Sequence, residues 1–264
     1  GVIKDDYKKL LIENNIEFEE ENHDEERILN ADWIVKSPGI PKKADIIYKI
    51  HQKGIRLSSE IEFAAEFTNA KIIAITGSNG KTIVKEWLYQ SLLGEFTLVK
   101  SPKSFNSQIG LALSLLEIDQ KHDLGIFEAG ISLPNEMANL EHIIQPKYGI
   151  LTNIGSVHDE GFANREAKIK EKIKLFGNCS DIFLEKNAEI EVLLPENSQK
   201  YTWSFSDKSA DLFVSKKNES GKTELTFKNA TNTFSVNIPF SDENSIENVI
   251  TCVNFMLFLG EEIT

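Results

Sequence analysis

The stretch that decides the fold runs from residue 72 to residue 82 and reads Ile72-Ile73-Ala74-Ile75-Thr76-Gly77-Ser78-Asn79-Gly80-Lys81-Thr82. Its first four residues are apolar, which indicates a buried strand, and residues 83–93 have the pattern of a helix. Between them lies a short turn that contains two glycines and leads directly into a lysine and a threonine. A strand, a glycine-containing turn and a helix in this order predict an α/β fold built on a parallel sheet.

The same turn has the chemistry of a phosphate-binding loop. Glycines let several backbone N–H groups point into one concavity, and the N-terminus of the following helix adds partial positive charge. Lys81 can reach the β- and γ-phosphates of a nucleotide, and the hydroxyl of Thr82 can bind Mg²⁺. The usual loop of this class has a glycine where this chain has Ile75, so a tight turn without a ligand is the alternative.

Strands and helices alternate on the C-terminal side of the loop. The predicted strands are residues 72–75, 124–128, 148–153 and 182–185, and the predicted helices are residues 83–93, 135–144, 166–176 and 245–259. Alternation of this kind predicts a mostly parallel sheet with helices on both faces. Residues 212–216, 224–228 and 233–238 alternate apolar and polar side chains, which predicts a small antiparallel sheet.

The first seventy residues form shorter α/β units. The apolar run Trp33–Val35 stops at the turn residues Ser37–Pro41, and residues 44–53 have helical spacing before Gly54. We expect a partial Rossmann-like α/β domain over residues 1–69 and a second domain over residues 70–264.

Composition limits the class of protein. Hydrophobic residues make up 41% of the chain and charged residues 27%, as in soluble globular proteins. The net charge of −12 argues against a broad nucleic-acid surface, although a phosphorylated small ligand can still bind locally. The apolar runs are too short to span a bilayer, and no signal peptide is recognisable. We therefore expect a cytoplasmic protein, monomeric and not inserted in a membrane, with both of its cysteines reduced.

Five segments, taken together, resemble the Mur ligases and the related folylpolyglutamate synthetases. Thr76–Thr82 is similar to the variant phosphate loop of this family, and four further motifs follow in the family's order: Ser104–Gly110, Phe127–Gly130, Thr152–His158 and Ser245–Asn248. By this ordered set the chain is identified as a member of the Mur ligase family.

Two types of Mur ligase are represented. Residues 71–260 resemble the MurF type, which adds D-alanyl-D-alanine to UDP-N-acetylmuramoyl-tripeptide, in the variant that is fused to alanine racemase. Residues 1–70 resemble the MurD type, which adds D-glutamate, at Lys36–Pro41 and Ser59–Phe63. The change of type falls at the shared phosphate loop, so a recombined or engineered chimera is a further hypothesis.

The resemblance implies specific roles for residues of this chain. The cofactors are ATP and Mg²⁺, and Lys81, Lys172 and His158 are the predicted catalytic residues. Nucleotide binding is implied for Gly77, Ser78, Asn79, Gly80, Lys81, Thr82, Asn106 and Asn248, and metal binding for Thr82, Glu128, His158 and Lys172. Lys172 matches the lysine that many Mur ligases carbamylate, which turns a cation into an anionic Mg²⁺ ligand. Lys168 shares its helix face at a spacing of four residues, whereas Lys170 points elsewhere.

Each role has a simpler alternative. Glu128 can be a solvated glutamate at a strand end, and His158 can be a surface residue. The lysines of residues 168–174 can form a solvated helix face. Asn106 can cap a turn, and Asn248 can be a polar residue in a first helical turn.

The implied reaction is ATP-dependent amide-bond formation in peptidoglycan precursor synthesis. The carboxylate of a UDP-N-acetylmuramoyl-peptide becomes an acyl phosphate, which a D-amino acid or dipeptide then attacks. Complete Mur ligases have a third domain, which we expect to be absent from this chain, so that it binds ATP–Mg²⁺ but does not complete ligation alone. The alternatives are a D-glutamate-adding ligase, a non-catalytic ATP-binding module and a folate-polyglutamating ligase.

Overall fold

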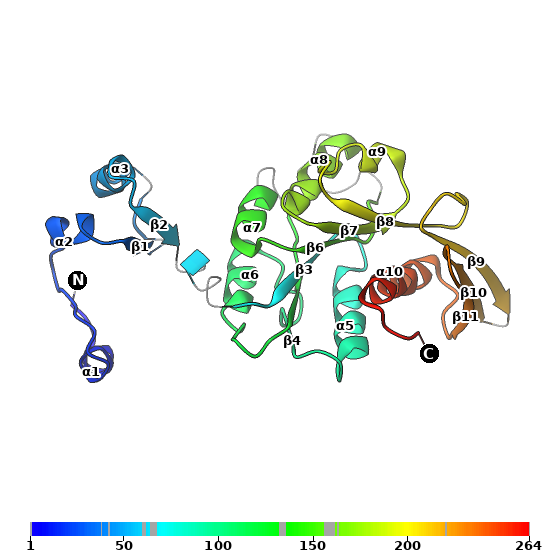
Figure 1. The fold of residues 1–264 in the computed structure, drawn as a ribbon, viewed down its shortest axis with the longest axis horizontal. Coiled ribbons are helices and arrows are strands. Elements are labelled where there is room, and N and C mark those ends of the chain that lie inside the picture. Colours follow the sequence, from blue (N-terminus) through cyan, green and yellow to red (C-terminus); the bar gives the residue numbers. More distant parts are fainter. Residues whose placement is uncertain are drawn as a thin grey trace. The chain divides into compact units, whose positions relative to one another are not determined.

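The computed structural model describes residues 2–37, 39–41, 43–59, 62–63, 68–131, 136–155, 162, 164–219 and 221–263. The chain divides into two compact units, Gly1–Glu66 and Phe67–Thr264, which Figure 1 draws as ribbons. The division falls close to the break in sequence pattern at residues 68–70. Within the described residues, no helix is both long and apolar enough to cross a membrane.

The N-terminal unit is a small α/β structure. Its elements in chain order are α1 (Asp5–Glu13), α2 (Glu25–Leu29), β1 (Trp33–Lys36), α3 (Asp45–Gln52) and β2 (Arg56–Ser59). The two strands are parallel, with Trp33 opposite Arg56 and Lys36 opposite Ser59, and α3 connects them. Ile47 and Ile50 of α3 are buried. A parallel strand pair with a helical crossover is the Rossmann-like unit expected from the sequence.

The second unit is built on a sheet of nine strands among the described residues. They are β3 (Lys71–Thr76), β4 (Leu98–Lys100), β5 (Leu124–Glu128), β6 (Tyr148–Leu151), β7 (Asp181–Glu185), β8 (Gln199–Ser204), β9 (Leu212–Glu219), β10 (Lys222–Lys228) and β11 (Thr233–Ile238). Their order across the sheet is β11-β10-β9-β8-β7-β6-β3-β5-β4. Neighbours from β4 to β9 are parallel, which confirms the predicted mostly parallel sheet.

The predicted antiparallel strands are observed as β9, β10 and β11. They extend the parallel sheet, because β9 pairs with the end of β8 at Trp203–Leu212 and Ser204–Phe213. Strand β10 runs antiparallel to both of its neighbours, β9 and β11.

Helices cover both faces of this sheet (Figure 1). The helices are α5 (Lys81–Leu92), α6 (Gln108–Leu115), α7 (Glu136–Ile144), α8 (Arg165–Ile173) with the 3₁₀ turn η1 (Lys174–Phe176), α9 (Ala188–Glu191) and α10 (Glu243–Leu259). On one face, Ile73 and Ile75 of β3 pack in a core with Leu88 of α5 and Phe255 of α10. On the other face, α6 packs against β5 and η1 packs against β6, and α7 packs against both α6 and η1.

Burial on both faces explains the apolar runs of the central strands. All five residues of β5 are buried, and β3 is buried from Ile72 to Thr76. A strand covered on two sides has no polar face, so its sequence does not alternate. Gly149 on β6 makes room for Phe176 of η1, because a Cβ at this position would lie 2.4 Å from the phenyl ring.

Helix α10 packs on both halves of the sheet. Its Phe255 belongs to the core with β3, whereas its Ile246 and Ile250 pack with Leu225 and Phe227 of β10. The carboxylate of Asp242 accepts a hydrogen bond from Ser245 N and caps the helix. The helix thus places its first turn at the carboxyl ends of the parallel strands, where the phosphate loop also lies.

Candidate functional site

The predicted phosphate loop connects β3 to α5, and both of its glycines are required. Gly77 has φ +150°, and a Cβ there would lie 2.0 Å from Oγ1 of Thr152. Gly80 has φ +82°, and its Cβ would lie 2.0 Å from Oδ1 of Asn248. The loop therefore combines left-handed backbone with close approach of two other segments, which a side chain would prevent.

The segment that follows β6 holds the loop in place. Ser78 N donates to the carbonyl oxygen of Asn153 at 2.8 Å, and Asn79 N donates to Oδ1 of Asn153 at 3.0 Å. The hydroxyl of Thr152 donates to the carbonyl oxygen of Asn79 at 2.6 Å, and Gly155 N donates to Oγ of Ser78 at 3.0 Å. These bonds fix the backbone of the loop from the side of the neighbouring strand.

The N-terminus of α5 suits an anion. The helix begins at Lys81 immediately after Gly80, no side chain of the described residues caps it, and its first turn contains no acidic residue. The first N–H groups of a helix have no partner within the helix and carry partial positive charge. Phosphate oxygens are natural acceptors for such groups.

Two lysines converge on one carbonyl oxygen of the loop. Lys81 Nζ and Lys172 Nζ each donate to the oxygen of Gly77 at 3.0 Å. Lys172 comes from α8, where Lys168 one turn earlier is also buried, whereas Lys170 is exposed and pairs with Glu166 at 2.5 Å. The predicted division of the helix face between these lysines is therefore observed. The alternative of a fully solvated lysine face is wrong for Lys168 and Lys172.

Burial lowers the pKa of both lysines at the loop. For Lys172 the pKa falls from 10.5 to about 7, first because the amine is removed from water and then because the ammonium groups of Lys81 and Lys168 repel its charge. Burial also lowers the pKa of Lys81, and the carboxylate of Glu128 partly opposes this effect. A substantial fraction of Lys172 is thus a neutral amine near neutral pH.

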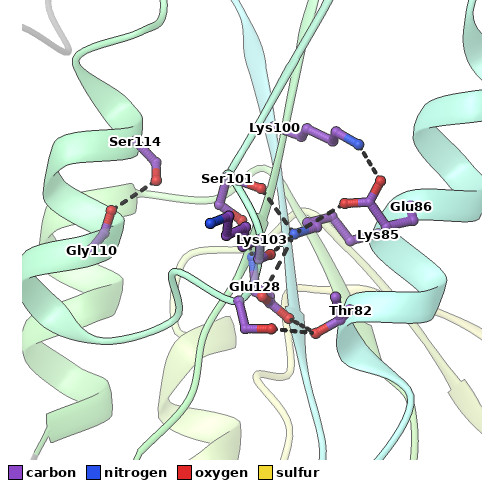
Figure 2. Close-up of polar contacts among 10 residues, drawn as sticks. Thr82, Lys85, Glu86, Lys100, Ser101, Lys103, Gly110, Ser114 and Glu128 are labelled. Atoms are coloured by element: carbon purple, nitrogen blue, oxygen red, sulfur yellow. Dashed lines mark hydrogen bonds and ion pairs between the residues drawn. The ribbon is translucent and has the colours of Figure 1, made fainter.

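Thr82 and Glu128 form the second part of the site (Figure 2). The Thr82 hydroxyl donates to Oε2 of Glu128 at 2.7 Å, and the Glu128 side chain is fully buried at the end of β5. The alternative of a solvated strand-end glutamate is therefore wrong. Oε1 of Glu128 is buried and accepts no hydrogen bond from the described residues.

This arrangement fits a magnesium ion. A hydroxyl beside a buried carboxylate is a donor set that Mg²⁺ accepts, and here the Thr82 hydroxyl lies against Oε2 of Glu128. No group of three or more His, Cys, Asp or Glu side chains gathers in the part of the chain that the structure describes. An ion held here would therefore need further ligands, which the phosphate oxygens of a nucleotide can supply.

The remaining predicted site residues differ in what the structure places around them. Asn106 lies beside Gly130, which follows Glu128 by two residues. The N–H of Gly130 donates to the backbone carbonyl oxygen of Asn106 at 2.9 Å. Asn248 is 3% exposed and packs on Gly80 rather than lining an open cavity. His158 lies outside the described residues.

A cavity of about 320 Å³ opens beside the loop. Its lining includes Asn79 and Asn153, Glu185 of β7, and Asn244 and Glu247 of α10. Burial raises the pKa of Glu185 and of Glu247, and the Glu247 carboxylate adds to the effect on Glu185. Sequence reasoning placed Asn248 at this end of α10, but its neighbours Asn244 and Glu247 are the residues that reach the cavity.

Lys85 was also missed in the sequence. It lies one turn after Lys81 on α5 and contacts Glu128, with Nζ 3.6 Å from Oε1. The spacing of four residues is the signal that could have found it, since it puts both lysines on one helix face.

Comparison with known proteins agrees with this geometry. Residues 75–256 match the model of the Mur ligase middle domain, and residues 1–46 match that of the MurD N-terminal domain. A UDP-N-acetylmuramoylalanine–D-glutamate ligase of Christiangramia forsetii is 37% identical over 182 residues, covering 69% of this chain and 39% of the relative. A UDP-N-acetylmuramoyl-tripeptide–D-alanyl-D-alanine ligase of Borreliella burgdorferi is 34% identical over 215 residues, covering 77% of this chain and 45% of the relative.

A solved structure of a Mur ligase has a similar fold. The crystal structure of MurF ligase from Thermotoga maritima in complex with ADP superposes with a TM-score of 0.68 at 21% identity, over 88% of this chain and 62% of that one. This chain spans less than half the length of the two curated relatives. The middle-domain match covers most of the chain and contains the phosphate loop, Glu128 and Lys172. The chain therefore belongs to the Mur ligase family.

Proposed function

We propose that this chain is the nucleotide-binding core of an ATP-dependent ligase that forms an amide bond on a UDP-N-acetylmuramoyl-peptide during peptidoglycan precursor synthesis. The observation that carries the proposal is the convergence of Lys81, Lys172 and the open N-terminus of α5 on one loop, with Thr82 and Glu128 beside it. The relatives that cover 69% and 77% of this chain both carry ligase names, which supports the reaction type.

The loop residues divide the work of holding ATP. The N–H groups of residues 80–82 at the start of α5 and the ammonium group of Lys81 would bind the phosphates, and Thr82 with Glu128 would bind Mg²⁺. The ion supplies positive charge that neutralises the phosphate oxygens as the γ-phosphoryl group leaves ATP. Lys81 adds charge at the same place, so that the carboxylate of the peptide substrate can attack phosphorus and form an acyl phosphate.

The cavity beside the loop is the place for the base of the nucleotide. It adjoins Asn79, and its amide and carboxyl groups on Asn153, Asn244 and Glu247 offer both donors and acceptors to a purine. Asn248, for which the resemblance implies nucleotide binding, would act through Gly80 by keeping the loop in shape.

Lys172 would act after reaction with carbon dioxide. Its neutral amine attacks the carbon of CO₂, the nitrogen loses a proton, and the resulting carbamate is an anionic ligand for Mg²⁺. The low pKa of about 7 favours this step, because only the unprotonated amine is nucleophilic. Together with His158, which lies outside the described residues, Lys172 completes the predicted catalytic set.

The amino acid that is added distinguishes two assignments. We favour D-alanyl-D-alanine, the MurF assignment, because the relative from Borreliella burgdorferi covers 77% of this chain. The second assignment is D-glutamate, because residues 1–46 match the N-terminal domain of MurD, and this part of the chain would contact the UDP-sugar. Equilibrium binding of UDP-N-acetylmuramoyl-tripeptide and of UDP-N-acetylmuramoyl-L-alanine to the same chain separates the two assignments.

The nucleotide site itself is tested by calorimetric titration of the chain with ATP and Mg²⁺. The unaltered chain is expected to bind ATP, and Lys81→Met is expected to weaken binding by about 100-fold, as for a lost charge-assisted phosphate contact. Lys170→Met is the matched control, because Lys170 is an exposed lysine on another helix, α8, and pairs with Glu166. Equal affinities of the unaltered chain and Lys81→Met would exclude the proposed site.

A further inference from the structure

Lys85 is fully buried, which is rare for a lysine. It lies in the second turn of α5, and its Nζ donates to the carbonyl oxygens of Ser101, at 2.9 Å, and of Lys103. The same ammonium group lies 3.6 Å from Oε1 of Glu128 and 3.4 Å from Oε1 of Glu86 (Figure 2). An ammonium group in the protein interior is costly unless acceptors and a counter-charge surround it, and here both do.

The two oxygens of the Glu128 carboxylate have different neighbours. Oε2 accepts the hydroxyl proton of Thr82 at 2.7 Å, on the side of the phosphate loop. Oε1 accepts no hydrogen bond from the described residues and faces the ammonium group of Lys85. Lys85 is itself held by two backbone carbonyl groups of the segment after β4, so it cannot turn away from Oε1 without losing them.

This division bears on which metal ion the site prefers. Mg²⁺ takes six ligands in a compact octahedron, whereas Ca²⁺ takes six to eight oxygen ligands and readily binds both oxygens of one carboxylate. A carboxylate whose second oxygen faces a fixed cation can offer only its first oxygen to a metal. Such a carboxylate suits Mg²⁺ and is a poor ligand for Ca²⁺.

We propose that Lys85 is a positioning residue that restricts Glu128 to one metal-binding oxygen and thereby makes the nucleotide site selective for Mg²⁺ over Ca²⁺. The inference rests on the proposed function, because it takes Glu128 as a ligand of the nucleotide-bound metal. A purely structural tether between α5 and residues 101–103 would use the two carbonyl bonds alone and would leave metal selectivity unchanged.

The test measures ATP affinity by calorimetry, once with Mg²⁺ and once with Ca²⁺, and uses the ratio of the two. Lys85→Gln removes the charge and keeps an N–H donor for the carbonyl groups, whereas Lys85→Met removes both. In each variant the ratio of the ATP affinity with Mg²⁺ to that with Ca²⁺ is expected to fall by about tenfold. The fall comes from stronger binding of ATP with Ca²⁺, because Oε1 becomes available to the larger ion. Lys85→Arg keeps the cation and is expected to keep the ratio of the unaltered chain.

Lys100→Met is the matched control. Lys100 lies in the same cluster but pairs with Glu86 rather than with Glu128, so its loss is expected to leave the ratio unchanged. Thermal unfolding of each variant verifies that it is folded. If Lys85→Met does not fold, the comparison uses Lys85→Gln alone.

Three results would overturn the inference. An unchanged ratio in a folded Lys85→Gln, with binding of ATP–Mg²⁺ retained, excludes metal selection and leaves the proposed function intact. An equal loss of affinity with both metals assigns Lys85 to the tether alone. Absence of ATP binding by the unaltered chain with either metal removes the proposed function and this inference together.

Discussion

Lys172 Nζ donates a hydrogen bond to the carbonyl oxygen of Gly77 at 3.0 Å, across a separation of 95 residues. The contact joins α8 to the loop between β3 and α5, and Lys172 is only 5% exposed. A lysine in this position must be either a compensated cation or a neutral amine. Its pKa of about 7 means that both forms exist near neutral pH, and the first two predictions follow from this.

Stability is expected to rise with pH because of Lys172. In the unfolded chain its pKa returns toward 10.5, so between pH 7 and pH 10 the unfolded state binds more protons than the folded state. The free energy of unfolding should therefore increase over this range by about 3 kcal/mol more in the unaltered chain than in Lys172→Met. Urea unfolding at several pH values measures the difference. The control Lys170→Met should follow the unaltered chain, and parallel curves for Lys172→Met would contradict the low pKa.

Carbon dioxide is expected to modify Lys172 selectively. At pH 8 its amine is mostly neutral, whereas exposed lysines with ordinary pKa values remain protonated. Incubation with ¹³C-bicarbonate should give a carbamate carbon resonance in the unaltered chain and in Lys170→Met, but not in Lys172→Met. A signal of equal intensity in all three proteins would show that the carbamate forms elsewhere.

The effects of substitutions at Gly80 and Asn248 on stability are expected to be energetically coupled. Gly80→Ala places a Cβ where Oδ1 of Asn248 lies and also strains a backbone with φ +82°, which together should cost about 3 kcal/mol. In the Asn248→Ala background the clash is removed and only the strain remains. Gly80→Ala should therefore cost at least about 1 kcal/mol less in that background, as measured by a double-mutant cycle. Additive effects would show that the side chain of Asn248 does not oppose a Cβ at this position.

Removing the charge of Glu247 is expected to stabilise the protein at neutral pH. Its pKa is raised, mainly by burial and also by Glu243, with Lys216 and a hydrogen bond from Asn153 in opposition. An acid with a raised pKa contributes stability at low pH and loses it as pH rises. Glu247→Gln should therefore increase the free energy of unfolding by about 0.5–1 kcal/mol at pH 7.5, but not at pH 4. Glu224→Gln, at an exposed position of β10, is the control, and the same shift at both pH values would rule out a charge effect.

Much of the sheet could be predicted because its strands are buried on both faces. Uninterrupted apolar runs gave β5 its observed bounds, Leu124–Glu128, and alternation gave β11 its bounds, Thr233–Ile238. The missed elements carry weaker signals. Strand β4 has three residues, and α6 contains Gly110 and begins in a segment of polar and turn-forming residues. At Gly110 a Cβ would lie 3.1 Å from Phe105, so close packing by the segment before the helix, rather than helix propensity, accounts for this glycine.

The site was predictable where a local motif fixes the chemistry. The loop lysine, Thr82 and Glu128 lie together as the motifs suggested. Lys85 and Glu247 could not be assigned in the same way, because charged residues on helices usually face water. The spacing of four residues from Lys81 gives the helix face of Lys85, but the burial of both side chains depends on which segments pack over α5 and α10. Asn248 is likewise buried against Gly80 of the loop, a contact that its place in the motif does not reveal, and its predicted role in nucleotide binding stays a prediction.

The separations in sequence around the phosphate loop have a consequence for biosynthesis. The ribosome completes the loop once it has added Thr82. The residues whose hydrogen bonds hold the loop lie 73 or more positions later in the sequence, and Asn248 lies on the last described helix. A ribosome-bound chain that ends before α10 therefore carries the loop without the side chain that packs on Gly80. Contacts between distant positions form slowly, so the ability to bind a nucleotide should appear as one of the last events of folding.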